Sequence, residues 1–483
     1  MQNRMPLVEA MLKYKNEKVY PFHTPGHKGG RGMEALLKNE LGAGAVAMDV
    51  SLMSELDDIH APSSYIMEAQ NLAAQLYGSD RCFFAVNGTT GAIHVMLMAA
   101  CKAGDKVLVP RNAHRSVAGA LLLANLEPVF AMPEYDAVFG INTQITPQAV
   151  EAMFARHADI KAVLVTSPNY YGQAADLKAI AGIAHAHNAA LLVDEAHGPH
   201  LGFSSKLPPS ALQCGADACA QSTHKILGAM TQCSLLHVKG GRINLTRAAE
   251  AVSLLTTTSP NYLLMASIDA ARYTLAVQGE KMIERALAAA EKLRSCLSKF
   301  AGLKLLDAGC TGKNGIAGFD CTKVTVNTAA WGYSGTEVGD ALRKAGIAVE
   351  LTDAQNVLFL VTFADSGAEY DAVLEKISSV FAGLEQHKRA PLKEQNCWKL
   401  PDFVTAVPLR SAFDSETESL PLQEAEGRIC AEQVSFYPPG IPVLWPGELV
   451  TAEVIDYCLR MKKLGLPVSG PADYTLTELR VIK

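Results

Sequence analysis

The sequence predicts an α/β fold in which a mostly parallel central sheet is covered by helices. Two observations carry this prediction. Between residues 60 and 250, short apolar runs alternate with longer runs of helical periodicity, and this alternation is typical of parallel strands joined by helical crossovers. Polar motifs also follow three of the apolar runs directly, at 87–89, 194 and 222. Ligands bind at such strand ends in sheets of this kind.

The elements of this region are expected in a regular order along the chain. Each short apolar run is expected to be a buried strand, and each amphipathic run a helix. Gly78 stands just past the first helix, as is common at helix C-termini. Helices are expected over 68–77, 91–101, 115–125 and 177–188, and strands over 82–86, 106–110, 162–166, 190–194 and 216–221.

The rest of the chain is expected to form an arm and two smaller units. The arm holds the cluster Thr24-Pro25-Gly26-His27-Lys28-Gly29-Gly30, which cannot be regular helix. A long helical stretch over about 262–300, strands near 323–327 and 357–363 and a helix from Thr336 indicate an α+β unit, which a polar stretch follows. We therefore expect an arm (1–45), a large ligand-binding domain (46–260), a small α+β domain (261–385) and a C-terminal domain (386–483).

Composition narrows the classes of function. The chain has 483 residues and a net charge of −6, and it carries no Lys/Arg block, so no nucleic-acid partner is expected. Its first residues lack the apolar core of a signal peptide, and its apolar runs are too short to span a bilayer. A cytoplasmic protein without a membrane partner is expected. The 11 cysteines are scattered without a CxxC pair, which favours reduced thiols over a metal site or a disulfide framework.

Three kinds of residue at the predicted strand ends point to one cofactor. Lys225 follows Ser222 closely, Asp194 ends an apolar strand, and Asn87-Gly88-Thr89-Thr90-Gly91 leads into a helix. A lysine that can form a Schiff base, an aspartate for a pyridinium nitrogen and a Gly/Thr turn for a phosphate are what pyridoxal 5′-phosphate (PLP) requires. The sequence therefore predicts a PLP site, with Lys225 as the residue that binds the cofactor covalently.

Each of these residues also has a simpler reading. Taken alone, Lys225 could be a solvated loop residue, and Asp194 could be the N-cap residue of the next turn. A carboxylate at a buried strand end is costly without a partner, however, and a protonated pyridine is such a partner. The Gly88-Thr89-Thr90 turn suits either a plain helix start or a phosphate nest, to which Ser222 adds a hydroxyl. His197 could contact the pyridine ring of the cofactor, or it could be a histidine of the core with a structural role alone. His114, at a third strand end, suits stacking on the pyridine face.

These motifs together resemble those of the ornithine/lysine/arginine decarboxylases, which are PLP enzymes of fold type I with an aspartate-aminotransferase-like fold. The chain is similar to a short bacterial form that lacks the N-terminal receiver-like domain. The motifs that carry the resemblance are Thr24-Pro25-Gly26-His27-Lys28-Gly29-Gly30, Leu56-Asp57-Asp58-Ile59-His60-Ala61-Pro62, Asn87-Gly88-Thr89-Thr90, Arg111-Asn112-Ala113-His114-Arg115-Ser116, Ser167-Pro168-Asn169-Tyr170-Tyr171-Gly172, Asp194-Glu195-Ala196-His197-Gly198, Ser222-Thr223-His224-Lys225, Thr258-Ser259-Pro260-Asn261-Tyr262 and Tyr437-Pro438-Pro439-Gly440-Ile441-Pro442.

The resemblance implies roles for individual residues. Lys225 is similar to the family's Schiff-base lysine, Asp194 to its pyridinium partner and His114 to its ring-stacking histidine. Phosphate contacts are implied for Thr89, Thr90, Ser222 and His224. Ser259 resembles a residue that reaches the phosphate in a neighbouring subunit, which implies a homodimer with shared active sites, or a higher oligomer. Arg115 and Asn169 depart from the Lys and Thr that are usual in the family.

The reaction implied is α-decarboxylation of a basic L-amino acid, within polyamine metabolism. Arginine is the first expectation, giving agmatine and CO2. Lysine and ornithine, giving cadaverine and putrescine, are the alternatives. Lys225 or His197 is expected to return the proton to Cα. Glu350 and Asp353, after an apolar strand pattern, are candidates to bind the distal cation of the substrate, unless they are ordinary surface carboxylates.

Two other classes of function share the same motifs. An aminotransferase would need Lys225 and Asp194 as well, but such enzymes usually carry an arginine on a late strand, and residues 357–365 contain none. A non-catalytic PLP-binding homologue is the other alternative, against which the complete set of cofactor residues argues.

Overall fold

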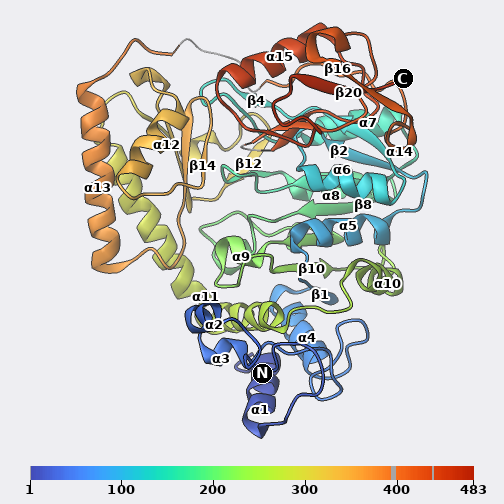
Figure 1. Ribbon diagram of the computed structural model, residues 1–483. Coiled ribbons are helices and arrows are strands. Elements are labelled where there is room, and N and C mark those ends of the chain that lie inside the picture. The colour runs from blue at the N-terminus through green and yellow to red at the C-terminus, as the bar shows by residue number, and fades with distance from the viewer. Residues whose placement is uncertain (1, 393–398, 438–439) are drawn as a thin grey trace. The chain divides into compact units, whose positions relative to one another are not determined.

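The computed structural model describes residues 2–392, 399–437 and 440–483 (Figure 1). Pro438 and Pro439 of the last motif, and Cys397, therefore lie outside the described residues. The chain forms two units. The first comprises Met1–Cys101, Ala190–Ser205 and Pro209–Met282, and the second comprises Lys102–Ala189, Lys206–Pro208 and Ile283–Lys483. Neither unit coincides with one of the four expected domains, whose boundaries stay a prediction.

The first unit contains four strands of the central sheet in the order β1-β10-β9-β8. They are β1 (Arg81–Ala85), β10 (Ser234–Val238), β9 (Ala218–Gln221) and β8 (Ala190–Asp194). Strands β8 and β9 run parallel, with Val193 opposite Cys219. The β1–β10 and β10–β9 pairs are antiparallel, so the sheet is mixed at this edge. Strand β10 was not predicted from the sequence.

The first unit also contains helices that precede, connect and follow these strands. They are α1 (Pro6–Glu17), α2 (Ala35–Leu41), α3 (Ala43–Val46), α4 (Tyr65–Tyr77), α5 (Gly88–Ala100), α9 (Thr223–Ile226), α10 (Leu245–Leu255) and the first part of α11 (Tyr262–Leu297). One apolar core joins α1, α4, β1 and α11 through Leu7, Ile66, Phe84 and Tyr262. At the far end of α5, the Arg247 guanidinium donates to the carbonyl oxygen of Met98, at 2.7 Å, and to that of Cys101. This contact caps the C-terminal turn of α5.

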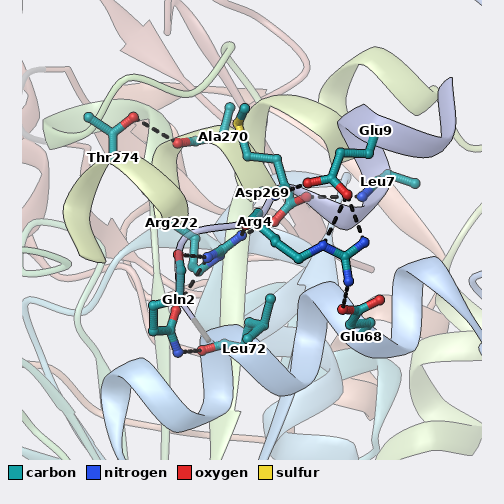
Figure 2. A network of polar contacts seen from close by, with 11 residues as sticks. Gln2, Arg4, Leu7, Glu9, Glu68, Leu72, Asp269, Ala270, Arg272 and Thr274 are labelled. Atoms are coloured by element: carbon teal, nitrogen blue, oxygen red, sulfur yellow. Dashed lines mark hydrogen bonds and ion pairs between the residues drawn. The ribbon is translucent and has the colours of Figure 1, made fainter. Parts of the chain in front are cut away.

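A buried ion pair anchors the N-terminal residues to α11 (Figure 2). The side chains of Arg272 and Asp269 are both 0% exposed. Arg272 donates to the backbone oxygens of Gln2 and Arg4, and Asp269 accepts a hydrogen bond of 3.0 Å from the Leu7 amide. Burial alone would make this pair costly, but its remaining hydrogen-bonding capacity is largely filled by backbone groups. The start of the chain is therefore fixed to the long helix.

The second unit contains a parallel part of the central sheet, in the order β6-β2-β3. These strands are β6 (Ile160–Thr166), β2 (Lys106–Pro110) and β3 (Glu127–Ala131), accompanied by α6 (Arg115–Leu123), α7 (Pro147–Arg156) and α8 (Leu177–Ala186). Strand β3 and helix α7 were not predicted. Across both units, each of the five strands predicted between residues 60 and 250 has a counterpart whose bounds lie within two residues. The predicted α/β class with a mostly parallel central sheet is confirmed.

The second unit also contains an antiparallel sheet in the order β11-β13-β15-β14. Its strands are β11 (Lys304–Leu306), β13 (Lys323–Asn327), β15 (Asn356–Leu360) and β14 (Leu351–Thr352), and they accompany α12 (Gly335–Lys344) and α13 (Gly367–Gln386). Leu293 of α11, Trp331 and Phe381 share one core with this sheet. The short strands β7 (Gln173–Ala175) and β12 (Ile316–Phe319) pair with each other, as do β4 (Tyr135–Asp136) and β5 (Ile141–Asn142).

The last hundred residues build a further core within the second unit. Strand β16 (Thr417–Pro421) pairs with β20 (Glu478–Ile482), and β17 (Val434–Phe436) lies between β18 (Ile441–Leu444) and β19 (Val468–Ser469). Helices α14 (Leu409–Asp414) and α15 (Ala452–Lys463) complete this part. Arg111, after β2, forms a buried ion pair of 2.9 Å with Glu448 and stacks near Phe130, Phe403 and Trp445. Among the described helices, none is both long and apolar enough to cross a bilayer.

Candidate active site

Lys225 lies on a short helix that directly follows a buried strand. All four residues of β9 are buried, Ser222 is the N-cap residue, and α9 carries the lysine. The Lys225 amide donates to the Ser222 carbonyl at 3.2 Å. The Nδ1 atom of the adjacent His224 lies 2.7 Å from the carbonyl oxygen of Cys233, which fixes the turn to the segment before β10. The lysine side chain is half-buried. Its helix is therefore held in place by neighbouring segments, while the side chain keeps some access to solvent.

The lysine amine shares a hydrogen bond with an imidazole. Lys225 Nζ lies 3.0 Å from Nε2 of His197. His197 is 3% exposed and follows β8, so it belongs to the neighbouring strand end. An imidazole at this distance can accept a proton from the amine or return one to it. The two residues therefore form a pair that is suited to moving a proton.

Asp194 is the last residue of β8 and is buried. One of its carboxylate oxygens accepts a hydrogen bond of 3.2 Å from the Ala196 amide. Burial raises the pKa of the Asp194 carboxyl, and the positive charge of Lys225 acts in the opposite direction. A desolvated carboxylate is stabilised by a cationic partner. Its environment therefore suits a protonated ring nitrogen.

Hydroxyl groups gather at the beginning of α5. Thr89 Oγ1 is hydrogen-bonded to Ser222 Oγ and, at 2.8 Å, to Ser234 Oγ. All three side chains are buried. Gly88 adopts the left-handed region, with φ of +67°, where the chain turns into the helix. The N-cap residue Asn87 makes no side-chain capping hydrogen bond, so the helix start is not closed by its own cap.

This arrangement fits the phosphate of PLP. Helix N-termini bind anions through backbone N–H groups, and hydroxyls supply further donors. Thr90 is exposed at the same helix start. Ser234 was missed from the sequence because its strand, β10, was itself not predicted. The first unit thus holds an amine at Lys225, a carboxylate at Asp194 and a phosphate cradle at Thr89, Ser222 and Ser234. These three groups match the aldehyde, the ring nitrogen and the phosphate of PLP.

His114 belongs to the second unit, where it caps a helix. Its Nδ1 atom accepts a hydrogen bond of 3.2 Å from the Ser116 amide at the start of α6, and it lies 2.9 Å from Ser116 Oγ. The ring borders a cavity of about 40 Å³ together with Thr166, Asn169 and Tyr170. The capping role explains how the ring is oriented. Stacking on a cofactor stays a prediction.

Ser259 lies in an exposed segment of the first unit. Its amide donates to Thr257 Oγ1 at 3.2 Å. His60, from the Leu56–Pro62 motif, lies 3.1 Å from the carbonyl oxygen of Thr257 and 3.2 Å from Ser253 Oγ. The motif around His60 therefore holds the segment in place while the side chain of Ser259 stays exposed.

The two candidates for the distal cation differ in their surroundings within the second unit. Glu350 is exposed and borders a cavity of about 580 Å³ that Asp365 and Glu369 also line. Asp353 is 0% exposed. It accepts hydrogen bonds from the Tyr171 hydroxyl at 2.7 Å and from the Asn356 side chain at 2.9 Å, besides two backbone amides. Its carboxylate is thus hydrogen-bonded to groups around the turn from β14 to β15, whereas that of Glu350 is exposed. Binding of the distal cation by either residue stays a prediction.

Comparison with known proteins identifies the family. Residues 5–369 match the family model of the Orn/Lys/Arg decarboxylase major domain, and residues 403–470 match that of the Orn/Lys/Arg decarboxylase C-terminal domain. The chain belongs to this family. The predicted family and the predicted class of enzyme, a PLP-dependent amino-acid decarboxylase, are thereby confirmed.

Relatives in this family match over the whole chain. An arginine decarboxylase of Bacillus anthracis is 41% identical over 487 residues, covering 100% of this chain and 98% of its own. An arginine decarboxylase of Bacillus subtilis is 40% identical, with the same coverage. Among solved structures, the lysine decarboxylase LdcF of Francisella novicida has a TM-score of 0.85 at 23% identity, covering 100% of this chain and 81% of that chain. At that identity the likeness shows the fold alone.

Proposed function

We propose that this protein is a PLP-dependent arginine decarboxylase that converts L-arginine to agmatine and CO2. The observation that carries the proposal is the Lys225–His197 pair beside Asp194, within a chain of this family. Arginine is favoured over lysine because the relatives named arginine decarboxylase are about 40% identical. The lysine decarboxylases among the solved structures are only 21–23% identical. Lysine and ornithine stay the alternatives.

Different residues of the first unit bind the cofactor and transfer the proton. Lys225 Nζ binds the cofactor covalently, and this requires an unprotonated amine. His197, 3.0 Å away, accepts a proton from that amine and returns it. Asp194 binds the ring nitrogen in its protonated form, and Thr89, Ser222 and Ser234 bind the phosphate. PLP supplies an electron sink for the bond that breaks. After loss of CO2, Lys225 Nζ or His197 Nε2 delivers a proton to Cα of the substrate.

Recognition of arginine also requires an acceptor for the guanidinium. Glu350 is our candidate, because its carboxylate is exposed on a segment of the second unit beside a sizeable cavity. A carboxylate binds a guanidinium with two parallel hydrogen bonds, which an ammonium group cannot reproduce. The same residue would therefore favour arginine over lysine.

We further propose that the enzyme works as a homodimer whose active sites are shared. Two features of the first unit support this. Ser259 is exposed rather than enclosed by its own chain. The N-terminal segment also exposes large apolar side chains, among them Phe22 at 91% and Leu36 at 68%. Exposed apolar side chains of this size are typical of a contact surface. We place the enzyme in the cytoplasm, to which ten described cysteines that form no disulfide are suited.

One parallel assay tests the proposal. The purified protein is supplied with PLP and with arginine, lysine or ornithine, and CO2 and amine products are measured. We expect agmatine and CO2 from arginine and a visible absorbance band that borohydride traps on Lys225. Lys225→Ala should remove the band and lower the activity by at least about 10³-fold. The exposed Lys239→Ala serves as the matched control. A keto-acid product without CO2 would indicate an aminotransferase instead.

A further inference from the structure

Glu195 is a buried carboxylate that stands directly after Asp194 and has no part in the mechanism above. It is 0% exposed. One of its oxygens accepts a hydrogen bond of 2.7 Å from the Ala211 amide, and the other accepts one of 2.7 Å from the side-chain amide of Gln221. Its own amide donates to Ala220 of the neighbouring strand at 2.9 Å. Glu195 is thus attached to the end of β9 through both backbone and side chain.

Gln221 is the last residue of β9 and precedes Ser222 and the helix that carries Lys225. It is 1% exposed. Within the described part of the chain, its Oε1 atom has no hydrogen-bond partner. The orientation of the side-chain amide is therefore set by the hydrogen bond that its Nε2 atom donates to Glu195. This bond links the residue beside Asp194 to the residue beside Ser222. It therefore joins the two strand ends that present opposite parts of the cofactor site.

We propose that Glu195 and Gln221 form a brace that sets the position of Asp194 relative to Lys225, which makes Glu195 a positioning residue. The inference rests on the proposed function, because it concerns the binding of PLP. The ring nitrogen and the aldehyde lie at opposite ends of a rigid ring, so the carboxylate and the amine that bind them must keep a fixed separation. They are supplied by two different strands. A hydrogen bond between the adjacent side chains opposes sliding or splaying of these strand ends.

The opposite ends of the same two strands provide an internal comparison. Asp217, just before β9, is also buried and accepts a hydrogen bond of 2.8 Å from the Leu191 amide of β8. Its backbone amide donates to the Leu191 carbonyl at 2.9 Å. Asp217 therefore ties β8 to β9 as Glu195 does, but at the end away from Asp194 and Ser222. Loss of either tie should weaken the sheet, whereas only loss of the Glu195 tie should disturb the cofactor site.

The experiment compares truncations at the two ends. PLP is removed from wild-type protein and from the Glu195→Ala, Gln221→Ala and Asp217→Ala variants. The dissociation constant for added PLP and the melting temperature of the apoprotein are then measured. We expect Glu195→Ala and Gln221→Ala each to weaken PLP binding about tenfold, the size expected for the loss of a buried hydrogen bond. The double variant should be no weaker than either single one. Asp217→Ala should lower the melting temperature and leave the dissociation constant within about twofold.

A conservative variant separates geometry from charge. In Glu195→Gln the new amide can donate to Gln221 Oε1 after rotation of the Gln221 side chain, so PLP binding should stay within about threefold of wild type. The proposed brace is refuted if Glu195→Ala binds PLP with the dissociation constant of wild type, or if Asp217→Ala weakens PLP binding equally. If Glu195→Ala does not fold, Gln221→Ala decides by the same criteria. A wild-type protein that takes up no PLP refutes the proposed function itself, and the brace with it.

Discussion

Nζ of Lys225 and Nε2 of His197 lie 3.0 Å apart, although 28 positions separate the two residues in the chain and they follow different strands. This contact depends on the parallel pairing of β8 and β9, which brings both strand ends to one edge of the sheet. It gives the amine a proton acceptor within direct reach. Several consequences of this and of other contacts can be measured.

Replacement of His197 should separate catalysis from cofactor binding. In His197→Phe the imidazole is lost but an aromatic side chain of similar bulk stays in the buried position. Because Lys225 then lacks its proton partner, we expect kcat for arginine to fall by about 10²- to 10⁴-fold, while PLP is still bound. Steady-state CO2 release and borohydride trapping measure the two quantities. The exposed His187 gives the control variant His187→Phe, which should leave both unchanged. Loss of PLP binding in His197→Phe would contradict a role in proton transfer.

Glu350 should determine the affinity for the distal cation. Glu350→Gln keeps the shape of the side chain but removes its charge, so we expect KM for arginine to rise about tenfold with little change in kcat. Initial rates over a range of arginine concentrations give both constants. Glu369, which borders the same cavity and is exposed, provides the control Glu369→Gln. Equal effects of the two substitutions would mean that general charge, rather than a specific contact, attracts the substrate.

The buried Arg272–Asp269 pair should contribute strongly to the stability of the first unit. Arg272→Met leaves the Asp269 carboxylate buried without its counter-ion, and we expect a loss of about 3–5 kcal/mol in the free energy of unfolding. The burial that raises the pKa of Asp269 would then act without the opposing effect of Arg272. Urea unfolding followed by circular dichroism measures the change. For the exposed pair Lys292–Asp371, Lys292→Met should cost less than about 1 kcal/mol. Similar losses in both variants would refute the contribution of burial.

Glu195 should make the stability of the protein depend on pH. Burial raises the pKa of Glu195 from its ordinary value of 4.5 to about 7. Between these values the unfolded chain loses the proton while the folded protein keeps it, so stability should fall as pH rises from about 4.5 to about 7. Above pH 7 the loss is constant, at a few kcal/mol, because the carboxyl is then ionised in both states.

The variant Glu195→Gln isolates this effect. His237, whose pKa burial lowers to about 3, acts in the opposite direction over part of the same range, so wild-type stability alone is ambiguous. The difference between Glu195→Gln and wild type cancels the contribution of His237. We expect this difference to grow in favour of the variant from pH 4.5 to pH 7, as measured by apoprotein melting. A difference that does not change with pH would place the pKa of Glu195 outside this range.

The sequence predicted the elements whose apolar runs are unbroken and missed those that are interrupted. Strand β8, ALLVD, was recognised at its actual bounds, and α11 was expected over about 262–300 against the observed Tyr262–Leu297. Strand β3 begins with Glu-Pro, and β10 contains a histidine that is nevertheless fully buried. Neither pattern predicts a buried strand from the sequence alone, because the burial of its polar residue depends on the neighbouring strands.

The candidate site was predicted where function requires an unusual residue, and missed where ordinary residues become important through contact. Lys225 and Asp194 stand out because a charged side chain after a buried strand needs a reason. Ser234 and Gln221 carry no such signal, because only the folded structure shows their hydrogen bonds to Thr89 and Glu195. For Asp353, the sequence could not show that Tyr171 and Asn356 donate hydrogen bonds to its carboxylate.

The anchoring of Gln2 and Arg4 by Arg272 has a practical outcome for handling this enzyme. An aminopeptidase that trims the first few residues would strip acceptors from a guanidinium that has no access to water, and would thereby loosen a helix that lies far along the chain.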